Sequence, residues 1–431
     1  MKSPYFVLLF LFLTLLYSCR KELSTTSMTN SLSKPNILLI IADDMGKDAT
    51  AGFTEGLIKP NTPKIDELKN TGLSFTNAWV NPTCSPTRAT IITGKYGFRT
   101  GVKWAGDILP ANEKVLQKYI NDNTNNAYST ALIGKWHLSG NAPNPTPEKF
   151  GIDYYAGVAS GAVTDYFNWT LTEDGKSTIQ SDYVTEHLTN LAIDWIGNQE
   201  KPWFLWMAYN APHTPFHTPP TQMHSQGTLP EYQTGMDATP YYLAAIEAMD
   251  YQIDRLISAM TPEQLANTVI IFIGDNGTPN QVAQYPYSKK TAKGTLYQGG
   301  VNVPLFITGK GVLRTGMDEN LICGTDLFAT IANLAGVAVS EIHDSKSFLP
   351  LLSNSGTIRS FQYSEMKFST NDLWAIRDRT YKLIVSADGT QEMFNLTSDP
   401  YEKTNLLVGT LTQVQQKAKA DLELEITRIR Q

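Results

Sequence analysis

The stretch Ile37-Leu38-Leu39-Ile40-Ile41-Ala42, followed at once by Asp43-Asp44, decides the fold. Its first six residues are continuously apolar and do not alternate with polar ones. Such runs are typical of strands that are buried on both faces, in a parallel sheet covered by helices. Two further runs of the same character, residues 203–208 and 268–273, indicate that the sheet has several strands of this kind.

Segments of helical character lie between these runs. Thr62 and Pro63 suit the cap and first turn of a helix, and residues 241–260 carry apolar side chains at helical spacing. Strands that alternate with helices predict an α/β fold. We expect this main domain to cover residues 35–350.

The pattern changes towards the C-terminus. Residues 373–377 and 381–385 have the character of short antiparallel strands joined by a turn. Residues 393–396 are a further candidate strand, and a final helix is expected at 411–430. The sequence therefore predicts a small C-terminal α+β subdomain, residues 351–431, that bears an antiparallel sheet and packs against the main domain.

The N-terminus has the features of an export signal. Lys2 precedes the apolar run 6–16, which is shorter than the about 20 residues needed to span a bilayer. Leu16-Tyr17-Ser18-Cys19 resembles a bacterial lipobox, although Tyr17 is not the usual small residue, so a plain signal peptide is the alternative. We expect a signal peptide at residues 1–18, a lipidated Cys19 and a polar tether at residues 19–34. The predicted location is outside the cytoplasm, as a membrane-anchored lipoprotein of the bacterial cell surface or periplasm.

Charge and cysteine content narrow the function. The formal net charge is -6 and no basic stripe is present, which argues against a nucleic-acid partner. Besides Cys19, only Cys84 and Cys323 remain, and in an exported chain they can form one disulfide. The apolar surroundings of Cys323 favour a buried inert thiol instead. The residues around Cys84 suggest that this cysteine takes part in a reaction.

Polar residues follow two of the predicted strands. Asp43 and Asp44 end the first run, and Asp275 and Asn276 follow the run at 268–273. In open α/β sheets ligands bind beyond the carboxyl ends of the strands, so these side chains converge if the two strands are neighbours. Three uncompensated carboxylates would repel one another, and a hard divalent cation with oxygen ligands relieves this. The alternative is that each pair is a polar turn.

The segment around Cys84 has the features of a helix N-terminus. Pro86 suits the first turn and Gly94 suits the end of the helix. Cys84 then lies where backbone amides and the helix dipole favour anions, and Arg88 lies one turn later on the same face. The alternative is a capped helix with a structural cysteine.

Cys84-x-Pro86-x-Arg88 resembles the signature of the sulfatase family, in which the cysteine is oxidised to formylglycine. The resemblance extends from about residue 35 to residue 407, with matching segments in matching order. These segments are residues 36–44, Gly134-Lys135-Trp136-His137, Ala211-Pro212-His213, residues 274–277, residues 293–300 and residues 394–406. It implies an alkaline-phosphatase-like fold, with a large mixed, mostly parallel sheet flanked by helices.

The resemblance also implies a role for each matching residue. Cys84, converted to formylglycine (3-oxoalanine) by a maturation enzyme, is the nucleophile. The metal is calcium, with magnesium as the alternative, and its ligands are Asp43, Asp44, Cys84, Asp275 and Asn276. Arg88 steadies the hydrated aldehyde, and Lys135 and Lys293 hold the sulfate. His137 is the base that releases sulfate. His213 is the general acid beside the leaving oxygen. Lys135, Lys293 and His213 also bind the substrate. Taken singly, each lysine fits a solvated surface charge and each histidine a structural residue.

A surface-tethered sulfatase suggests a sulfated polysaccharide or oligosaccharide as substrate. Two alternatives stay open: a formylglycine-dependent phosphonate or phosphate ester hydrolase, and a non-catalytic surface lipoprotein that binds sulfated glycans. His213 and His217 have the spacing of a zinc motif, but the prolines around them exclude a helix. Asn302 stands where many relatives carry arginine. Five aromatic residues outside the family motifs are candidates for stacking on sugars or for core packing: Trp104, Tyr154, Tyr155, Tyr166 and Trp169.

Overall fold

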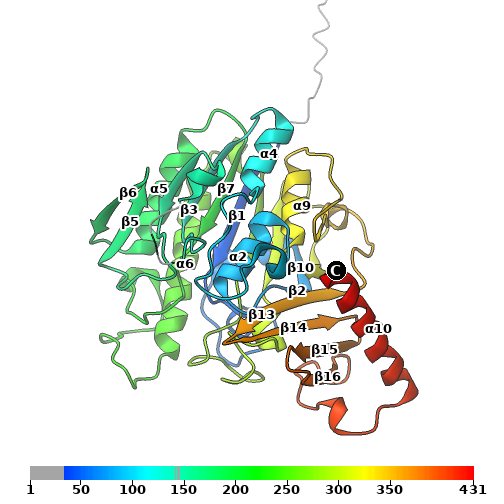
Figure 1. The fold of residues 1–431 in the computed structure, drawn as a ribbon. Coiled ribbons are helices and arrows are strands. Elements are labelled where there is room, and N and C mark those ends of the chain that lie inside the picture. Colours follow the sequence, from blue (N-terminus) through cyan, green and yellow to red (C-terminus); the bar gives the residue numbers. More distant parts are fainter. Residues whose placement is uncertain (1–33, 141, 143–145) are drawn as a thin grey trace, which may run out of the picture. The chain divides into compact units, whose positions relative to one another are not determined.

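A computed structural model describes residues 34–140, 142 and 146–431 of the chain (Figure 1). The predicted signal peptide, the lipidated Cys19 and nearly all of the tether lie outside the described residues. Within the described ranges, no helix combines the length and the apolar character needed to cross a membrane.

A ten-stranded sheet forms the centre of the fold, in the order β10-β2-β9-β8-β1-β7-β3-β4-β5-β6. The three apolar runs of the sequence are its adjacent strands β8 (Thr268–Gly274), β1 (Asn36–Ala42) and β7 (Trp203–Ala208). They are parallel and in register, with Leu38 paired to Leu205 on one side and to Ile270 on the other. All their residues are buried, which explains why the runs are continuous rather than alternating.

The sheet is mixed, as expected. On one side, β9 runs antiparallel between β8 and β2, while on the other β5 and β6 form an antiparallel edge hairpin. The bounds of these outer strands are β2 (Leu73–Trp79), β3 (Ser129–Gly134), β4 (Tyr154–Gly157), β5 (Trp169–Glu173), β6 (Lys176–Gln180), β9 (Leu305–Gly309) and β10 (Gly316–Cys323). The prediction of a large, mostly parallel sheet flanked by helices is confirmed.

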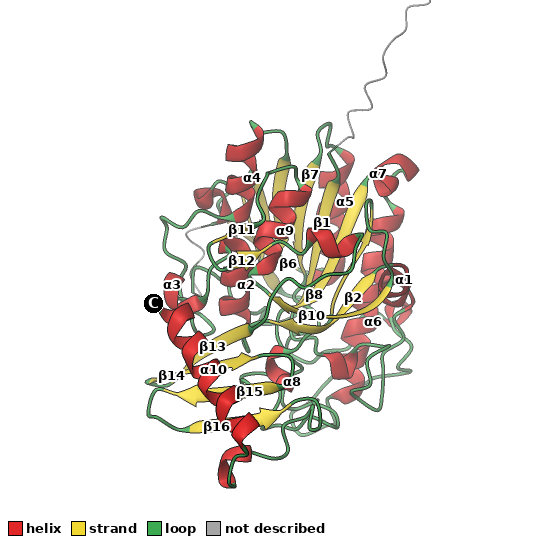
Figure 2. Cartoon of the chain, turned by 90° about the vertical axis from the view of Figure 1, so that its right-hand side faces the viewer, coloured by secondary structure: helices red, strands yellow, loops and turns green. Residues whose placement is uncertain are grey.

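Helices cover both faces of the sheet, because alternate residues of β1 point into two separate cores. Ile37, Leu39 and Ile41 share a core with α2 (Cys84–Thr93), α4 (Leu116–Thr124) and α9 (Asp326–Leu334). Leu38 and Ile40 share the other with α1 (Pro63–Thr71), α5 (Val184–Gly197) and α6 (Thr239–Ser258). Figure 2 shows the helices on the two sides of the strands. The helices expected at Thr62-Pro63 and at 241–260 are α1 and α6.

A second, four-stranded antiparallel sheet follows, and α10 (Gln413–Arg430) packs on it through Leu422 and Ile426 (Figure 1). Its strands are β13 (Gln362–Phe368), β14 (Asn371–Arg377), β15 (Tyr381–Ser386) and β16 (Gln391–Asn395). This confirms the expected antiparallel sheet and final helix. Residues 34–431 form one compact unit, so the domain boundary at residue 350 stays a prediction. The short elements are α3 (Gly97–Thr100), α7 (Pro262–Ala266), α8 (Gln298–Val301), β11 (Glu341–Ile342) and β12 (Ser345–Lys346).

Candidate active site

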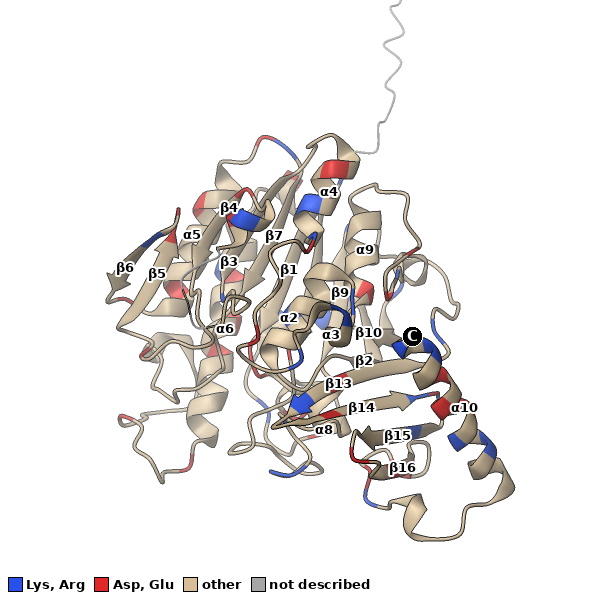
Figure 3. Cartoon of the chain, in the orientation of Figure 1, with Lys and Arg blue, Asp and Glu red and all other residues tan. Residues whose placement is uncertain are grey.

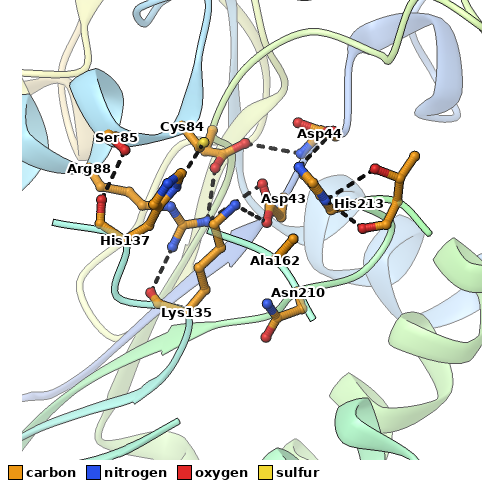
Figure 4. A network of polar contacts seen from close by, with 12 residues as sticks. Asp43, Asp44, Cys84, Ser85, Arg88, Lys135, His137, Ala162, Asn210 and His213 are labelled. Atoms are coloured by element: carbon orange, nitrogen blue, oxygen red, sulfur yellow. Dashed lines mark hydrogen bonds and ion pairs between the residues drawn. The ribbon is translucent and has the colours of Figure 1, made fainter. Parts of the chain in front are cut away.

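The predicted oxygen ligands meet at the carboxyl edge of the central sheet, and Figure 4 shows Asp43 and Asp44 among them. Because β1 and β8 are neighbours, Asp43 and Asp44 come together with Asp275 and Asn276. The Asp44 backbone amide donates to Asp275 Oδ1 at 3.0 Å, and Asn276 Nδ2 donates to Asp44 Oδ1 at 2.8 Å. Asp44 has a φ of 72°, a left-handed conformation that aspartate tolerates better than most residues. The convergence inferred from the sequence is confirmed.

Each of the three carboxylates has a cationic partner. Lys135 Nζ lies 2.6 Å from Asp43 Oδ2, and Lys293 Nζ lies 2.6 Å from Asp44 Oδ2. Arg88 Nη2 lies 2.8 Å from Asp275 Oδ2. The three carboxylates are therefore not uncompensated, because they pair with the same three cations that the family resemblance assigns to the site. The site thus gathers three carboxylates and three cations at one edge of the sheet.

The pKa values of the site follow from burial and from these pairs. Burial alone would raise the pKa of Asp44, but Lys293, His213 and Lys135 hold it well below its usual value. Burial and the neighbouring Asp43 charge raise the pKa of Asp275 to about 6. Burial would lower the pKa of Lys293, yet the Asp44 carboxylate raises it above its usual value.

Two buried oxygens of the cluster are left without a hydrogen-bond partner. These are Asp43 Oδ1 and Asn276 Oδ1, both in side chains that are fully buried. Asp43, Asp44 and His213 also offer ligand atoms that all lie within 4.8 Å of one another. Leaving an acceptor buried and unpaired is costly, and carboxylate and amide oxygens are what calcium and magnesium prefer. The residues present thus fit a hard divalent cation.

Cys84 begins helix α2, as predicted, and Gly94 ends it with a φ of 68°. The Cys84 thiol lies 3.2 Å from His137 Nδ1, and burial raises its pKa. Cys84 and Cys323 are both buried free thiols, so the disulfide alternative is wrong and the buried thiol expected at Cys323 is confirmed.

Arg88 connects three elements of the site. It lies one turn after Cys84 on α2 and is almost fully buried. Its Nη1 donates to the backbone oxygen of Lys135 at 2.9 Å, while Nη2 pairs with Asp275. The guanidinium thereby fixes the start of α2 against the ends of β3 and β8.

His137 is held firmly in the loop after β3. Its φ is 51°, and Ser85 Oγ donates to its backbone oxygen at 2.9 Å. A Cβ on Gly161 would lie 2.3 Å from His137 Nε2, so only glycine leaves room for the ring there. Burial, together with the Lys135 and Arg88 charges, lowers the pKa of His137 to about 2. Its imidazole is therefore neutral at neutral pH.

His213 lies in the loop after β7, on the other side of the acidic cluster. Its Nδ1 lies 2.7 Å from the Thr214 backbone oxygen, and its Nε2 lies 3.7 Å from Asp44 Oδ2. Burial lowers the pKa of His213 to about 4. His217 points its ring atoms elsewhere, with Nδ1 near the Pro215 oxygen and Nε2 near the Tyr183 hydroxyl, in accord with the exclusion of a zinc pair.

Three residues of the site were missed by the sequence reasoning. Asn210 is buried at the end of β7, and neither amide atom has a hydrogen-bond partner. The signal was available, because Asn210 follows an apolar run just as Asp43 does. Ser85 stands inside the Cys84-x-Pro86 motif, at its variable position. Gly161 carries no local signal, since its role depends on His137 from another part of the chain.

Other residues singled out from the sequence lie in the framework. Tyr155 and Trp169 are buried in the two cores, so core packing is confirmed for them. Tyr154 donates to Glu173 at 2.5 Å. Asn302 accepts from the Ala78 amide at 3.1 Å and donates to the Thr76 oxygen at 3.2 Å, so its side chain is hydrogen-bonded to the backbone of β2.

Positive charge is scattered over the ribbon in Figure 3 and interleaved with acidic residues. At the carboxyl edge of the sheet, Arg88, Lys135 and Lys293 lie close together, each paired with a carboxylate. Beside them are a cysteine at a helix N-terminus and two neutral histidines. The fold and this arrangement together are those of a hydrolase of the alkaline-phosphatase-like class.

Comparison with known proteins gives the family. The Sulfatase family model matches residues 35–337, and the model for the C-terminal part of N-sulphoglucosamine sulphohydrolase matches residues 290–431. The chain belongs to the sulfatase family and is a sulfuric ester hydrolase.

Relatives agree over most of the chain. An uncharacterised sulfatase of Escherichia coli (strain K12) is 27% identical, over 76% of this chain and 68% of its own. The ulvan-active sulfatase of Formosa agariphila is 25% identical, over 91% of this chain and 81% of its own. The crystal structure of Ps i-CgsB in complex with k-i-k-neocarrahexaose is 27% identical with a TM-score of 0.77, and the match covers 92% of both chains.

Proposed function

We propose that the chain hydrolyses sulfate esters of sulfated polysaccharides or oligosaccharides, using a formylglycine made from Cys84 by a maturation enzyme and a bound calcium ion. The observation that carries this proposal is the Cys84 thiol at the start of α2, 3.2 Å from His137 and beside the Arg88, Lys135 and Lys293 cations. Relatives that are named for ulvan or were crystallised with a neocarrahexaose support a glycan substrate.

Formylglycine and calcium supply chemistry that the unmodified side chains lack. In a hydrated formylglycine one hydroxyl could attack sulfur, and the other could lose its proton so that the aldehyde re-forms as sulfate leaves, which a thiol does not offer. Asp43, Asp44, Asp275, Asn276 and residue 84 would hold the cation, and calcium supplies positive charge that polarises the sulfate oxygens. The unpaired oxygens of Asp43 and Asn276 support this ligand set.

The lysines bind and orient the sulfate. Lys135 and Lys293 come from distant parts of the sequence, and their ammonium groups lie beside Asp43 and Asp44. Their ammonium groups would contact the sulfate oxygens, where negative charge grows in the transition state. Arg88, fixed by the Lys135 oxygen and Asp275, keeps residue 84 in position.

The histidines handle protons. Neutral His137 faces residue 84 through Nδ1 and would accept the proton of the second formylglycine hydroxyl as sulfate leaves. Its pKa of about 2 disfavours the protonated form, and the negative charge of the bound sulfate would raise that pKa. His213, beside Asp44, would protonate the leaving sugar oxygen. Its pKa of about 4 without substrate disfavours the acid form, and the negative charge of a bound sulfate would raise that pKa.

Two measurements test the proposal against its alternatives. The mass of the peptide that contains Cys84, from protein co-expressed with a maturation enzyme, shows whether the thiol has become an aldehyde. Turnover of matched aryl sulfate, phosphate and phosphonate esters then tests the reaction. We expect an oxidised Cys84 and a clear preference for sulfate. A wide preference for phosphate or phosphonate esters would contradict the proposal and favour the phosphonate or phosphate ester hydrolase.

A further inference from the structure

A cavity of about 430 Å³ lies beside the loop that carries His213. Its walls come from two segments, residues 164–167 and residues 215–232. The lining includes aromatic, carboxylate and imidazole side chains, namely those of Asp165, Phe167, Phe216, His217, Glu231 and Tyr232.

This cavity shares a wall with the candidate active site. The Tyr166 hydroxyl lies 2.7 Å from the His213 backbone oxygen and 2.9 Å from the Asn210 backbone oxygen, so it can donate to either. The His217 ring stacks on Tyr166, with centroids 3.6 Å apart. In the proposed reaction His213 serves the leaving oxygen, which belongs to the sugar. The rest of the glycan therefore leaves the sulfate pocket on the side of His213, where this cavity lies.

Aromatic rings give the cavity apolar surfaces that suit the C–H face of a sugar ring. Phe167 is 39% exposed, unusual for so large an apolar side chain. Phe216 and Tyr232 lie on the opposite segment, with ring centroids 5.4 Å apart at 64°. These rings lose little conformational freedom when a ligand covers them.

The charged groups that line the cavity are carboxylates, so its charge is negative. Asp165 and Glu231 are exposed carboxylates, and none of the lining residues is a lysine or an arginine. His217 adds no positive charge at neutral pH, because burial lowers its pKa to about 4. Carboxylates accept hydrogen bonds from sugar hydroxyls, but they repel a sulfate or a carboxylate.

We propose that this cavity is the subsite for an uncharged sugar, next to the sugar that carries the cleaved sulfate, and that Asp165 and Glu231 select against a neighbour that bears its own sulfate or carboxylate. The inference rests on the proposed function, because it needs a glycan to extend from the His213 side. It narrows the substrate to glycans in which the sulfated sugar is linked to a neutral one.

The test uses Cys84→Ala protein with calcium, so that the oligosaccharides stay intact. Calorimetric titration compares two oligosaccharides with the same sulfated sugar, one linked to a neutral hexose and one to a uronic acid. We expect the neutral neighbour to bind about tenfold more tightly, because like charges disfavour the uronic acid. In the double variant Asp165→Asn, Glu231→Gln the preference should largely disappear, and Glu231→Lys should reverse it.

Asp194→Asn is the matched control, since it removes one exposed carboxylate of α5 outside the cavity and should keep the preference. Thermal unfolding of every variant shows whether it is folded. Equal binding of the two oligosaccharides, no binding of either, or a preference that survives in the double variant would overturn the inference. Aryl sulfate turnover by the matured protein without the Cys84 substitution tests the proposed function separately.

Discussion

At the scale of single residues, the carboxylates and cations of the site neutralise one another in pairs. Lys135 is engaged by Asp43, and Lys293 by Asp44, at distances of 2.6 Å. A sulfate needs the same ammonium groups. A divalent cation that draws the carboxylates to itself would free the lysines for the anion, so metal and sulfate should assist each other's binding.

This reciprocity gives the first prediction. In Cys84→Ala protein freed of metal, inorganic sulfate should bind weakly, and calcium should tighten it about tenfold, a typical coupling between two sites. Calorimetric titration with and without calcium measures the factor. Asp43→Asn should reduce both calcium binding and the coupling. Equal sulfate affinity in the two conditions would show that the lysines are not released by the metal.

Gly161 allows a second test at this scale. A Cβ there would lie 2.3 Å from His137 Nε2 and would displace the ring from its present position beside residue 84. Because a displacement of about 1 Å can cost about 100-fold in rate, we expect Gly161→Ala to lower kcat by about that factor. Gly197→Ala is the control, since no atom lies near its added Cβ. Full kcat in Gly161→Ala would mean that the position of His137 does not matter.

At the scale of elements, the C-terminal sheet supports the segment that follows Lys293. Lys382 on β15 donates to the Leu296 oxygen at 2.5 Å and forms a buried pair with Glu402. Glu402 in turn accepts from the Gln298 amide at 2.6 Å. The second sheet thus braces one wall of the site, although it supplies none of the proposed catalytic residues.

Breaking this brace should cost stability. Lys382→Met leaves the Glu402 carboxylate buried without its partner, and such changes cost about 3–5 kcal/mol. Urea unfolding measures the loss, and Lys417→Met, in the exposed pair with Asp421, should change stability little. If the two variants lose equally little stability, the buried pair does not hold the two sheets together.

The same elements show what the sequence could and could not reveal. The central strands β8, β1 and β7 were predicted because both their faces are buried and their sequences are continuously apolar. Strand β13 was not predicted, because Gln362 and Ser364 are polar and interrupt any apolar run there. They are buried against the large sheet, where they donate to the Ile322 and Val80 oxygens at 2.7 and 2.8 Å. Such partners lie far away in the sequence.

The site divides in the same way. Residues that follow strands or match a motif, such as Asp43, Asp275 and Cys84, were found from the sequence. Their pairing with Arg88, Lys135 and Lys293 was not, because it depends on how three distant segments fold together. Gly161 acts only through the space that it leaves for His137.

At the scale of the whole molecule, the location of the enzyme is a prediction that rests on the N-terminal sequence alone. We propose that Cys19 carries a lipid and that the chain is exported and held at a membrane, where it meets large external glycans. Cys19→Ala should then move the protein from the membrane fraction to the soluble fraction of the expressing bacterium, as immunoblotting of the fractions would show. A parent protein that is already soluble would contradict the anchor and favour a plain signal peptide.

The most direct test of the central claim is sulfate release from a panel of sulfated polysaccharides and oligosaccharides. The protein is co-expressed with a maturation enzyme, supplied with calcium and assayed beside Cys84→Ala. We predict that the matured protein releases sulfate from at least one glycan and that the variant releases none. Equal release by both would show that residue 84 is not the nucleophile, and no release by a demonstrably matured protein would contradict the assignment of a sulfated glycan as substrate.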